Sequence, residues 1–212
     1  ATGFVWFGTE TAGLIRYDPL TQTSLQYRSN INTTSGFTDT SAWWCYASPD
    51  GPMWVSTGEG SVFQVDLFTN NIPVQLSDTL VMNDITEETD SILWIGTQNG
   101  LLRADLQNSS VQQFRHDPQN PESLSDNVVV AVVKDSDGMM WLGTQNGLNK
   151  FDPDTHTIKR ILHDPNNKAS LSNNNIKGIF EDKDHNLWIA TYGGGLNRLD
   201  KRTEKFFSYV ND

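Results

Sequence analysis

The chain has 212 residues and a formal net charge of -11, from 26 acidic and 15 basic residues. This balance argues against nucleic acid as a partner, because nucleic-acid affinity depends on neutralising phosphates with Lys and Arg. No apolar run approaches the roughly 20 residues of a membrane-spanning helix, so we expect no membrane contact by this segment. The single cysteine, Cys45, excludes an internal disulfide and is expected to be a small buried apolar residue.

A short tryptophan-bearing phrase recurs along the chain. It reads FVWFGT, PMWVST, ILWIGT, MMWLGT and NLWIAT around Trp6, Trp54, Trp94, Trp141 and Trp188, at spacings of 48, 40, 47 and 47. Residues 94–140 and 141–187 align without gaps at 18 identities in 47 positions. A fixed period that carries an intact phrase indicates a tandem repeat. We expect each tryptophan to be the buried anchor of its repeat.

Each repeat divides into four short strands, most clearly over 127–162. The turn signals between them are Asp137-Gly138, Gln145-Asn146-Gly147 and Pro153-Asp154-Thr155. A longer polar link, 163–175, leads to the next repeat. The first strand is apolar on consecutive residues, so both of its faces should be covered. Tandem four-stranded antiparallel sheets with covered faces predict an all-β fold, a β-propeller.

In chain order, we expect one β-propeller segment over 1–212. Its blades are predicted at 4–29 (partial, with no first strand), 42–76, 81–116, 127–162 and 176–210, which makes 19 strands or about 4.75 blades. A closed five-bladed ring is one possibility. We favour an arc of a longer propeller, because a first blade without its inner strand would leave main-chain groups unpaired in a closed ring. The small residues Gly8, Gly96 and Gly143 should allow a neighbouring sheet to approach closely, with Ser56 and Ala190 in the same slot elsewhere.

The turns between second and third strands carry the candidate ligand-binding residues: Glu10, Glu59, Gln98, Asn99, Gln145, Asn146 and Tyr192. In an up-and-down blade these turns share one face with the long links. Loops on a rigid scaffold commonly carry binding, and amide, carboxylate and aromatic groups together suit a sugar. A solvated turn without any ligand is the alternative for every one of these positions.

Other polar residues are assigned structural roles. His116 and His163 occupy equivalent links before Asp-Pro and predict a repeated turn. The pairs Asp135/Asp137 and Asp182/Asp184 are expected to cap their own turns, since a calcium loop with its terminal Glu is absent. Gly193-Gly194-Gly195 predicts a lengthened turn rather than a phosphate-binding loop, and the adjacent Trp43 and Trp44 are expected to pack in the core. We expect no catalytic constellation, metal or cofactor.

The phrase D-x-D-G-x-x-W-[IL]-G-T-x-N-G-L, which stands here at 135–148, resembles the two-component-regulator propeller repeat. Two further parts of that repeat, H-D-P-x-N and S-L-S, stand here at 116–120 and 123–125 and again 47 residues later. The resemblance covers essentially the whole chain but weakens in the first two repeats. It implies the periplasmic sensor region of a hybrid two-component histidine kinase, built from seven-bladed propellers, with oligosaccharides as common ligands and signalling through association of the parent chains.

Two rival functions stay open at this point. A propeller enzyme of lyase or hydrolase type would require a non-repeated acid and base cluster near the axis. A structural spacer would contact neighbouring blades or domains and bind no small ligand. A WD-repeat propeller is disfavoured because its Trp-Asp and Gly-His signatures do not occur at the required places.

Overall fold

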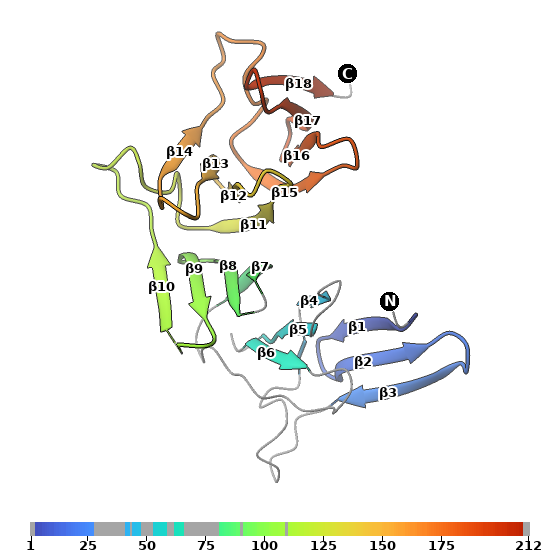
Figure 1. Ribbon diagram of the computed structural model, residues 1–212. Helices are drawn as coiled ribbons and strands as arrows, with labels where there is room; N and C mark the ends of the chain where they lie inside the picture. Colours follow the sequence, from blue (N-terminus) through green and yellow to red (C-terminus); the bar gives the residue numbers. More distant parts are fainter. Residues whose placement is uncertain are drawn as a thin grey trace. The chain divides into compact units, whose positions relative to one another are not determined.

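In its described part the protein is an all-β molecule. The computed structural model describes residues 3–27, 41–42, 44–47, 53–58, 62–65, 81–89, 91–108 and 110–209, and these residues form 18 strands and no helix (Figure 1). They divide into two compact units, Ala1–Met82 and Asn83–Asp212. Each sheet is named here by the tryptophan of its repeat.

The N-terminal unit contains two three-stranded antiparallel sheets. The Trp6 sheet comprises β1 (Val5–Thr9), β2 (Gly13–Asp18) and β3 (Thr23–Tyr27), and the Trp54 sheet comprises β4 (Trp44–Ala47), β5 (Met53–Ser56) and β6 (Val62–Val65). Leu14 from the first sheet packs with Ala42, Met53 and Val55. This cluster of buried side chains joins the two sheets into one unit.

The C-terminal unit contains three four-stranded antiparallel sheets, each in up-and-down order. The Trp94 sheet comprises β7 (Met82–Thr89), β8 (Ile92–Thr97), β9 (Gly100–Asp105) and β10 (Ser110–Phe114). The Trp141 sheet comprises β11 (Val129–Lys134), β12 (Met140–Thr144), β13 (Gly147–Phe151) and β14 (Ile158–Ile161). The Trp188 sheet comprises β15 (Ile176–Glu181), β16 (Leu187–Thr191), β17 (Gly195–Asp200) and β18 (Lys205–Tyr209). Up-and-down order in every sheet is the order expected of propeller blades.

Within this unit each sheet packs face to face on the next one along the chain. Strand β11 contacts β8 of the preceding sheet and β15 of the following sheet. The Trp94 ring lies 4.9 Å, centroid to centroid, from the Phe151 ring of the next sheet in an edge-on contact. Trp141 is buried in a cluster that includes Leu199 of the sheet after it. Both faces of β11 are therefore covered, as its unbroken apolar run predicts.

Three glycines that stand two positions after a tryptophan lie where the following part of the chain comes closest. A Cβ built on Gly96 would lie 3.0 Å from the Val129 side chain, and one on Gly143 would lie 2.5 Å from Ile176 Cγ2. A Cβ on Gly8 would meet the Ala42 carbonyl oxygen at 2.5 Å. Real Cβ atoms do not approach to 2.5 Å and seldom to 3.0 Å, so the close approach predicted at these glycines is confirmed.

The predicted fold class, an all-β chain of tandem four-stranded antiparallel propeller blades, is confirmed. The fourth strand predicted for the second blade falls within 66–80, outside the described residues. Trp43 and the side chain of Trp44 lie outside them too. Cys45 is only partly buried, at the margin of the N-terminal core, where burial raises the pKa of its thiol to about 11.

Candidate functional site

The candidate site is the end of each sheet at which the second strand turns into the third, called here the turn face. In the C-terminal unit these turns are tied to the ends of the long links: the Gly100 N–H donates to the Asn127 carbonyl at 2.6 Å, and the Gly147 N–H donates to the Asn174 carbonyl at 2.8 Å. Turns and link ends therefore share one face, as predicted. Main-chain anchoring of this kind makes the turns rigid platforms for their side chains.

In four of these turns, a threonine at an equivalent position donates a hydrogen bond across the turn. The hydroxyls of Thr9, Thr97 and Thr144 donate to the carbonyls of Gly13, Gly100 and Gly147 at 2.7 to 2.8 Å, and Thr191 makes the same bond to Gly195 at 3.2 Å. Gly100 and Gly147 have φ of +111° and +130°. Only glycine adopts this conformation without strain, so the spacing from threonine to glycine is fixed by the turn.

The predicted binding residues differ in how their side chains are held. Gln98 is exposed but donates its amide N–H to Asn83 Oδ1 at 2.9 Å, and the Asn83 amide in turn donates to the Val129 carbonyl at 2.8 Å. Asn99, beside it, is exposed, and its main-chain carbonyl accepts a bond from Gln113 Nε2 at 2.8 Å. The Gln98 side chain is thus held by a hydrogen-bonded network, whereas Asn99 is held through its main chain.

The corresponding turn of the Trp141 sheet presents free amides. Gln145 and Asn146 are exposed, and within the described part of the chain neither side chain makes a hydrogen bond; only their main-chain N–H groups do, to Val128 and Thr144. Their donors and acceptors are therefore directed to solvent and available to a ligand.

An aromatic side chain replaces the amides in the turn of the Trp188 sheet. Tyr192 is 69% exposed, and the Lys177 ammonium lies 5.3 Å from its ring centroid. Gly193 and Gly194 lengthen the turn, as predicted. In the N-terminal unit Glu10 is exposed at the equivalent turn, and Glu59 lies outside the described residues. Amide and aromatic groups thus occupy the same end of their respective sheets.

The polar scaffold beneath the turn face is buried and satisfied. Asn149 and Asn197 are fully buried, and each accepts a main-chain N–H bond, from Ser125 and Ser172, at 2.8 and 3.0 Å. Their amides donate back to the hydroxyls of the same serines. These side chains hold the S-L-S segment of each link in place and are not available to a ligand.

The histidines of the links are structural. The Nδ1 atoms of His116 and His163 lie 2.6 Å from the carbonyls of Leu124 and Leu171, and their main-chain N–H groups donate to Asn127 and Asn174. Arg160 also stabilises the first link, because it donates to the carbonyls of Ser123, Asp117 and Asn120. The repeated-turn interpretation of both histidines is confirmed.

The opposite end of each sheet is called here the hairpin face. There the tryptophan has a hydrogen-bond acceptor that was not predicted from the sequence. The indole N–H groups of Trp94, Trp141 and Trp188 donate at 2.7 to 2.8 Å to carboxylates six residues earlier: Glu88, Asp135 and Asp182. Asp135 and Asp182 also cap their own turns, as predicted, through main-chain N–H bonds. The constant spacing of acid and tryptophan was the available signal.

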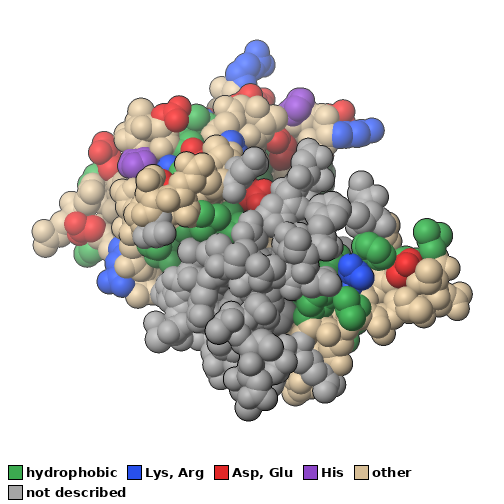
Figure 2. Space-filling view, turned by 60° about the horizontal axis from the view of Figure 1, so that its bottom comes forward, with side chains coloured by type: hydrophobic (Ala, Val, Ile, Leu, Met, Phe, Trp, Pro, Cys, Tyr) green, Lys and Arg blue, Asp and Glu red, His purple; other side chains and the backbone are tan. Residues whose placement is uncertain are grey.

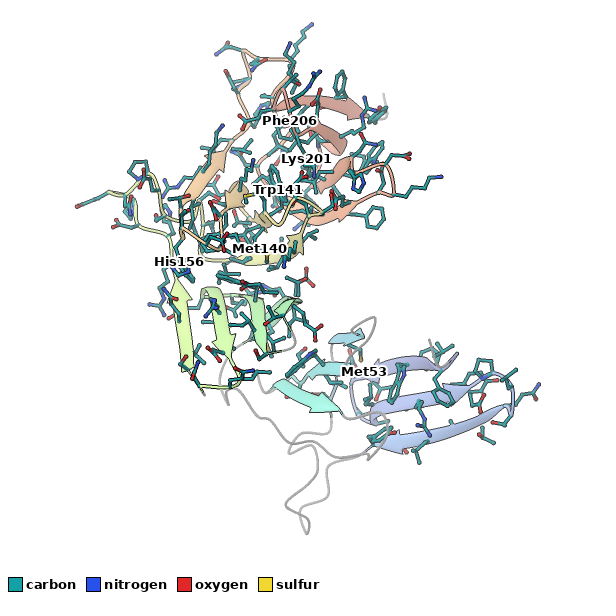
Figure 3. All side chains as sticks on the ribbon, viewed as in Figure 1. Met53, Met140, Trp141, His156, Lys201 and Phe206 are labelled. Carbon is teal, nitrogen blue, oxygen red and sulfur yellow. The ribbon has the colours of Figure 1, made fainter. Side chains whose placement is uncertain are left out.

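A charged cluster joins the last two sheets at the hairpin face (Figure 3). Lys201 Nζ lies 3.2 Å from Asp135, 2.7 Å from Asp137 and 2.9 Å from Glu181. Burial opposes the charged ammonium, but hydrogen bonds to the three carboxylates raise the pKa of Lys201 overall. Because the lysine is 15% exposed and fully engaged, this cluster serves to hold the sheets together and not to transfer protons.

The described residues contain no group of three or more His, Cys, Asp or Glu side chains that could hold a metal ion. They also contain no helix long and apolar enough to cross a membrane. On the side shown in Figure 2, acidic side chains are spread over the described surface among Lys and Arg and form no single patch.

Comparison with known proteins identifies the repeats. The family model described as two component regulator propeller matches residues 123–146 and 170–193. Each range contains the end of a long link, the first two strands of a sheet and the start of the turn that follows them. Two of the chain's repeats are therefore two-component regulator propeller repeats. This is the family that the sequence resembles, and the predicted family is confirmed.

The chain spans less than a third of the length of each relative described here. The chain is 35% identical over 134 residues to a protein named histidine kinase P4 from Formosa agariphila, a match that covers 59% of this chain and 10% of that protein. It is similar to the extracellular domain of a putative hybrid two component system from B. thetaiotaomicron, with a TM-score of 0.80 and 26% identity over 100% of this chain and 27% of that chain. PorZ of Porphyromonas gingivalis, with a TM-score of 0.77 and 15% identity over 99% of this chain and 32% of that one, shares the fold.

Proposed function

We propose that this propeller segment senses an oligosaccharide for a hybrid two-component sensor kinase, on the periplasmic side of the inner membrane. The similarity to an extracellular domain of a hybrid two component system and to a histidine kinase supports the setting. The exposed, unpaired amides of Gln145 and Asn146 on anchored turns support the site. Sugar hydroxyls need donors and acceptors in fixed positions, and a rigid turn supplies them at little entropic cost.

The aromatic member of the turn face fits the same ligand class. A pyranose presents an apolar C–H face as well as hydroxyls, and the exposed ring of Tyr192 offers a flat surface for such a face. Signalling then requires that the ligand bind one arrangement of the parent chains more tightly than another. We propose that association of two parent chains is the step that the ligand biases.

The test is calorimetry of this protein against a panel of neutral and acidic oligosaccharides. The double variant Gln145→Ala/Asn146→Ala should weaken binding of the active sugar about tenfold or more, since each lost hydrogen bond is worth ~1 kcal/mol. The matched control is Asp154→Ala at the hairpin face, which should bind as the unaltered protein does.

Two outcomes would replace this proposal. Binding accompanied by a shortened or unsaturated product would indicate a lyase or hydrolase. No detectable binding of any oligosaccharide in the panel would favour a structural spacer that only contacts neighbouring blades or domains. Sedimentation of the parent chain with and without the active sugar tests association separately, and an unchanged sedimentation coefficient would contradict that step.

A further inference from the structure

The turn face of the Trp188 sheet carries an exposed cation beside an exposed ring. Lys177 is exposed near the start of β15, and its ammonium lies 5.3 Å from the ring centroid of Tyr192. Within the described part of the chain, no carboxylate lies within salt-bridge distance of this ammonium. Lys159 and Lys201, by contrast, are both paired with carboxylates. The charge of Lys177 is therefore available to a ligand.

The preceding repeat has neither the cation nor the ring at the same place. Val130 and Gln145 stand 47 positions before Lys177 and Tyr192. Val130 packs against a cluster of buried apolar side chains, so the fold of the repeat needs no cation at this position. Gln145 is exposed although another sheet packs against its own sheet, so a residue at this place in the turn stays exposed in a covered sheet. The lysine and the ring are thus additions to the common framework of the repeat.

A second replacement removes a negative charge beside the same turn. In the preceding repeat, the Asp126 carboxylate accepts a hydrogen bond from the Val128 N–H at 2.7 Å. Its equivalent, Asn173, accepts the same bond from the Asn175 N–H at 2.8 Å, and the Asn175 carbonyl accepts the Tyr192 N–H at 2.8 Å. The amide therefore makes the bond next to the turn without a charge. Aspartate to asparagine and valine to lysine each raise the local charge by one.

We propose that Lys177 and Tyr192 form a subsite for an anionic group, a carboxylate or a sulfate, so that the oligosaccharide sensed is an acidic one. This inference rests on the proposed function and names the class of its ligand. The ammonium binds the anionic group through charge-assisted hydrogen bonds, and the ring packs on the C–H face of the sugar. Because the ammonium and the ring centroid are 5.3 Å apart, one sugar residue contacts both. The net charge of -11 does not oppose this strongly, since charges beyond about 8 Å are largely screened at physiological ionic strength.

Calorimetry of this protein tests the inference by comparing each acidic oligosaccharide with a neutral counterpart of the same sugar. The probes are oligogalacturonides with their methyl esters, and sulfated galactan oligosaccharides with their desulfated forms, beside a set of neutral oligosaccharides. We expect an acidic probe to bind about tenfold or more tightly than its neutral counterpart, because hydrogen bonds to charged groups are the stronger ones. The two pairs of probes distinguish a carboxylate from a sulfate as the group that is bound.

Variants of the two residues separate their roles. Lys177→Gln should weaken the acidic probe about tenfold and leave its neutral counterpart and the urea midpoint unchanged, whereas Lys177→Arg, which keeps the charge, should retain most of the affinity. Tyr192→Ala should weaken the acidic probe and its neutral counterpart alike, since the ring contacts the C–H face of both. The matched control is Lys183→Gln, which removes the same charge from an exposed lysine at the hairpin face of the same sheet and should bind as the unaltered protein does.

The outcomes distinguish this inference from the proposed function. An acidic probe that binds equally well to Lys177→Gln and Lys183→Gln would overturn the anionic subsite and leave oligosaccharide sensing in place. A neutral oligosaccharide that binds more tightly than every acidic probe would do the same. No binding of any probe would contradict the proposed function itself, and the anionic subsite with it.

Discussion

Adding one methyl group between two sheets should destabilise the C-terminal unit. In Gly143→Ala the new Cβ would lie 2.5 Å from Ile176 Cγ2 and 3.1 Å from Ile176 Cβ, so one sheet must move or Ile176 must leave its rotamer. Such overpacking costs about 1–3 kcal/mol. An alanine normally stabilises a strand relative to glycine by roughly 0.5–1 kcal/mol, so the steric cost outweighs this gain.

The matched control is Gly178→Ala. Nothing lies within 4 Å of a Cβ built on Gly178, which is also in a strand. We expect no loss of stability there and a gain of up to about 1 kcal/mol. Urea unfolding followed by fluorescence measures both, provided that the slope with urea concentration is unchanged.

A double-mutant cycle makes the test specific for the contact. Ile176→Ala alone should cost about 2–5 kcal/mol through the cavity it leaves. In Gly143→Ala/Ile176→Ala the new methyl has room, so the combined loss should be smaller than the sum by about 1 kcal/mol. Strict additivity, or a Gly143→Ala protein as stable as Gly178→Ala, would refute the packing of these sheets through the glycine slot.

Three further predictions concern the hairpin face. Asp135→Ala leaves the buried Trp141 indole N–H without its acceptor and should lower the free energy of unfolding in urea by about 1–3 kcal/mol; an unchanged midpoint would argue against this bond. Lys201→Met leaves carboxylates of two sheets unneutralised and should cost about 1–3 kcal/mol in the same assay, less in high salt, whereas equal stability would indicate that the cluster contributes nothing. The Trp188 indole N–H and nearby main-chain donors lower the pKa of Asp182 from 3.8 to about 2, so its contribution is complete above pH 3.8 and is lost as the pH falls toward 2. In Asp182→Asn, the free energy of unfolding should fall less steeply as the pH is lowered from 3.8 toward 2. The same fall as in the unaltered protein would contradict this.

Much of the fold could be predicted from the sequence because the repeat is regular. The phrase around Trp141 recurs with its turn residues intact, and each Asp-Gly or Asn-Gly turn limits where a hairpin can lie. The glycine slots at 96 and 143 were predicted because a missing side chain inside a strand has a packing reason. These are local rules, and they hold for each sheet by itself.

Such local rules could not predict contacts between residues that are far apart in the sequence. The register of β11 on β12 shifts between Val129 and Ala131, and that of β15 on β16 shifts between Ile176 and Gly178. An apolar run does not reveal these irregularities, since it looks the same with or without an extra residue. The position of Lys201 among carboxylates of two sheets likewise depends on how sheets stack, which no single repeat encodes.

The candidate site was predicted only in part. Turn chemistry placed Gln145, Asn146 and Tyr192 on an exposed turn face, and the structure puts them there. The pairing of Gln98 with Asn83 was not foreseen, because the partner lies in another strand of the same sheet. Whether these groups bind a sugar depends on a ligand and stays a prediction.

In the C-terminal unit, successive tryptophan-bearing sheets pack face to face. Nuclear Overhauser effects between the ring protons of Trp94 and Phe151, in protein labelled selectively on these two residue types, measure that packing directly. With ring centroids 4.9 Å apart across the two sheets, we expect strong cross-peaks between the rings. Cross-peaks from Trp94 only to residues of its own sheet would contradict the account.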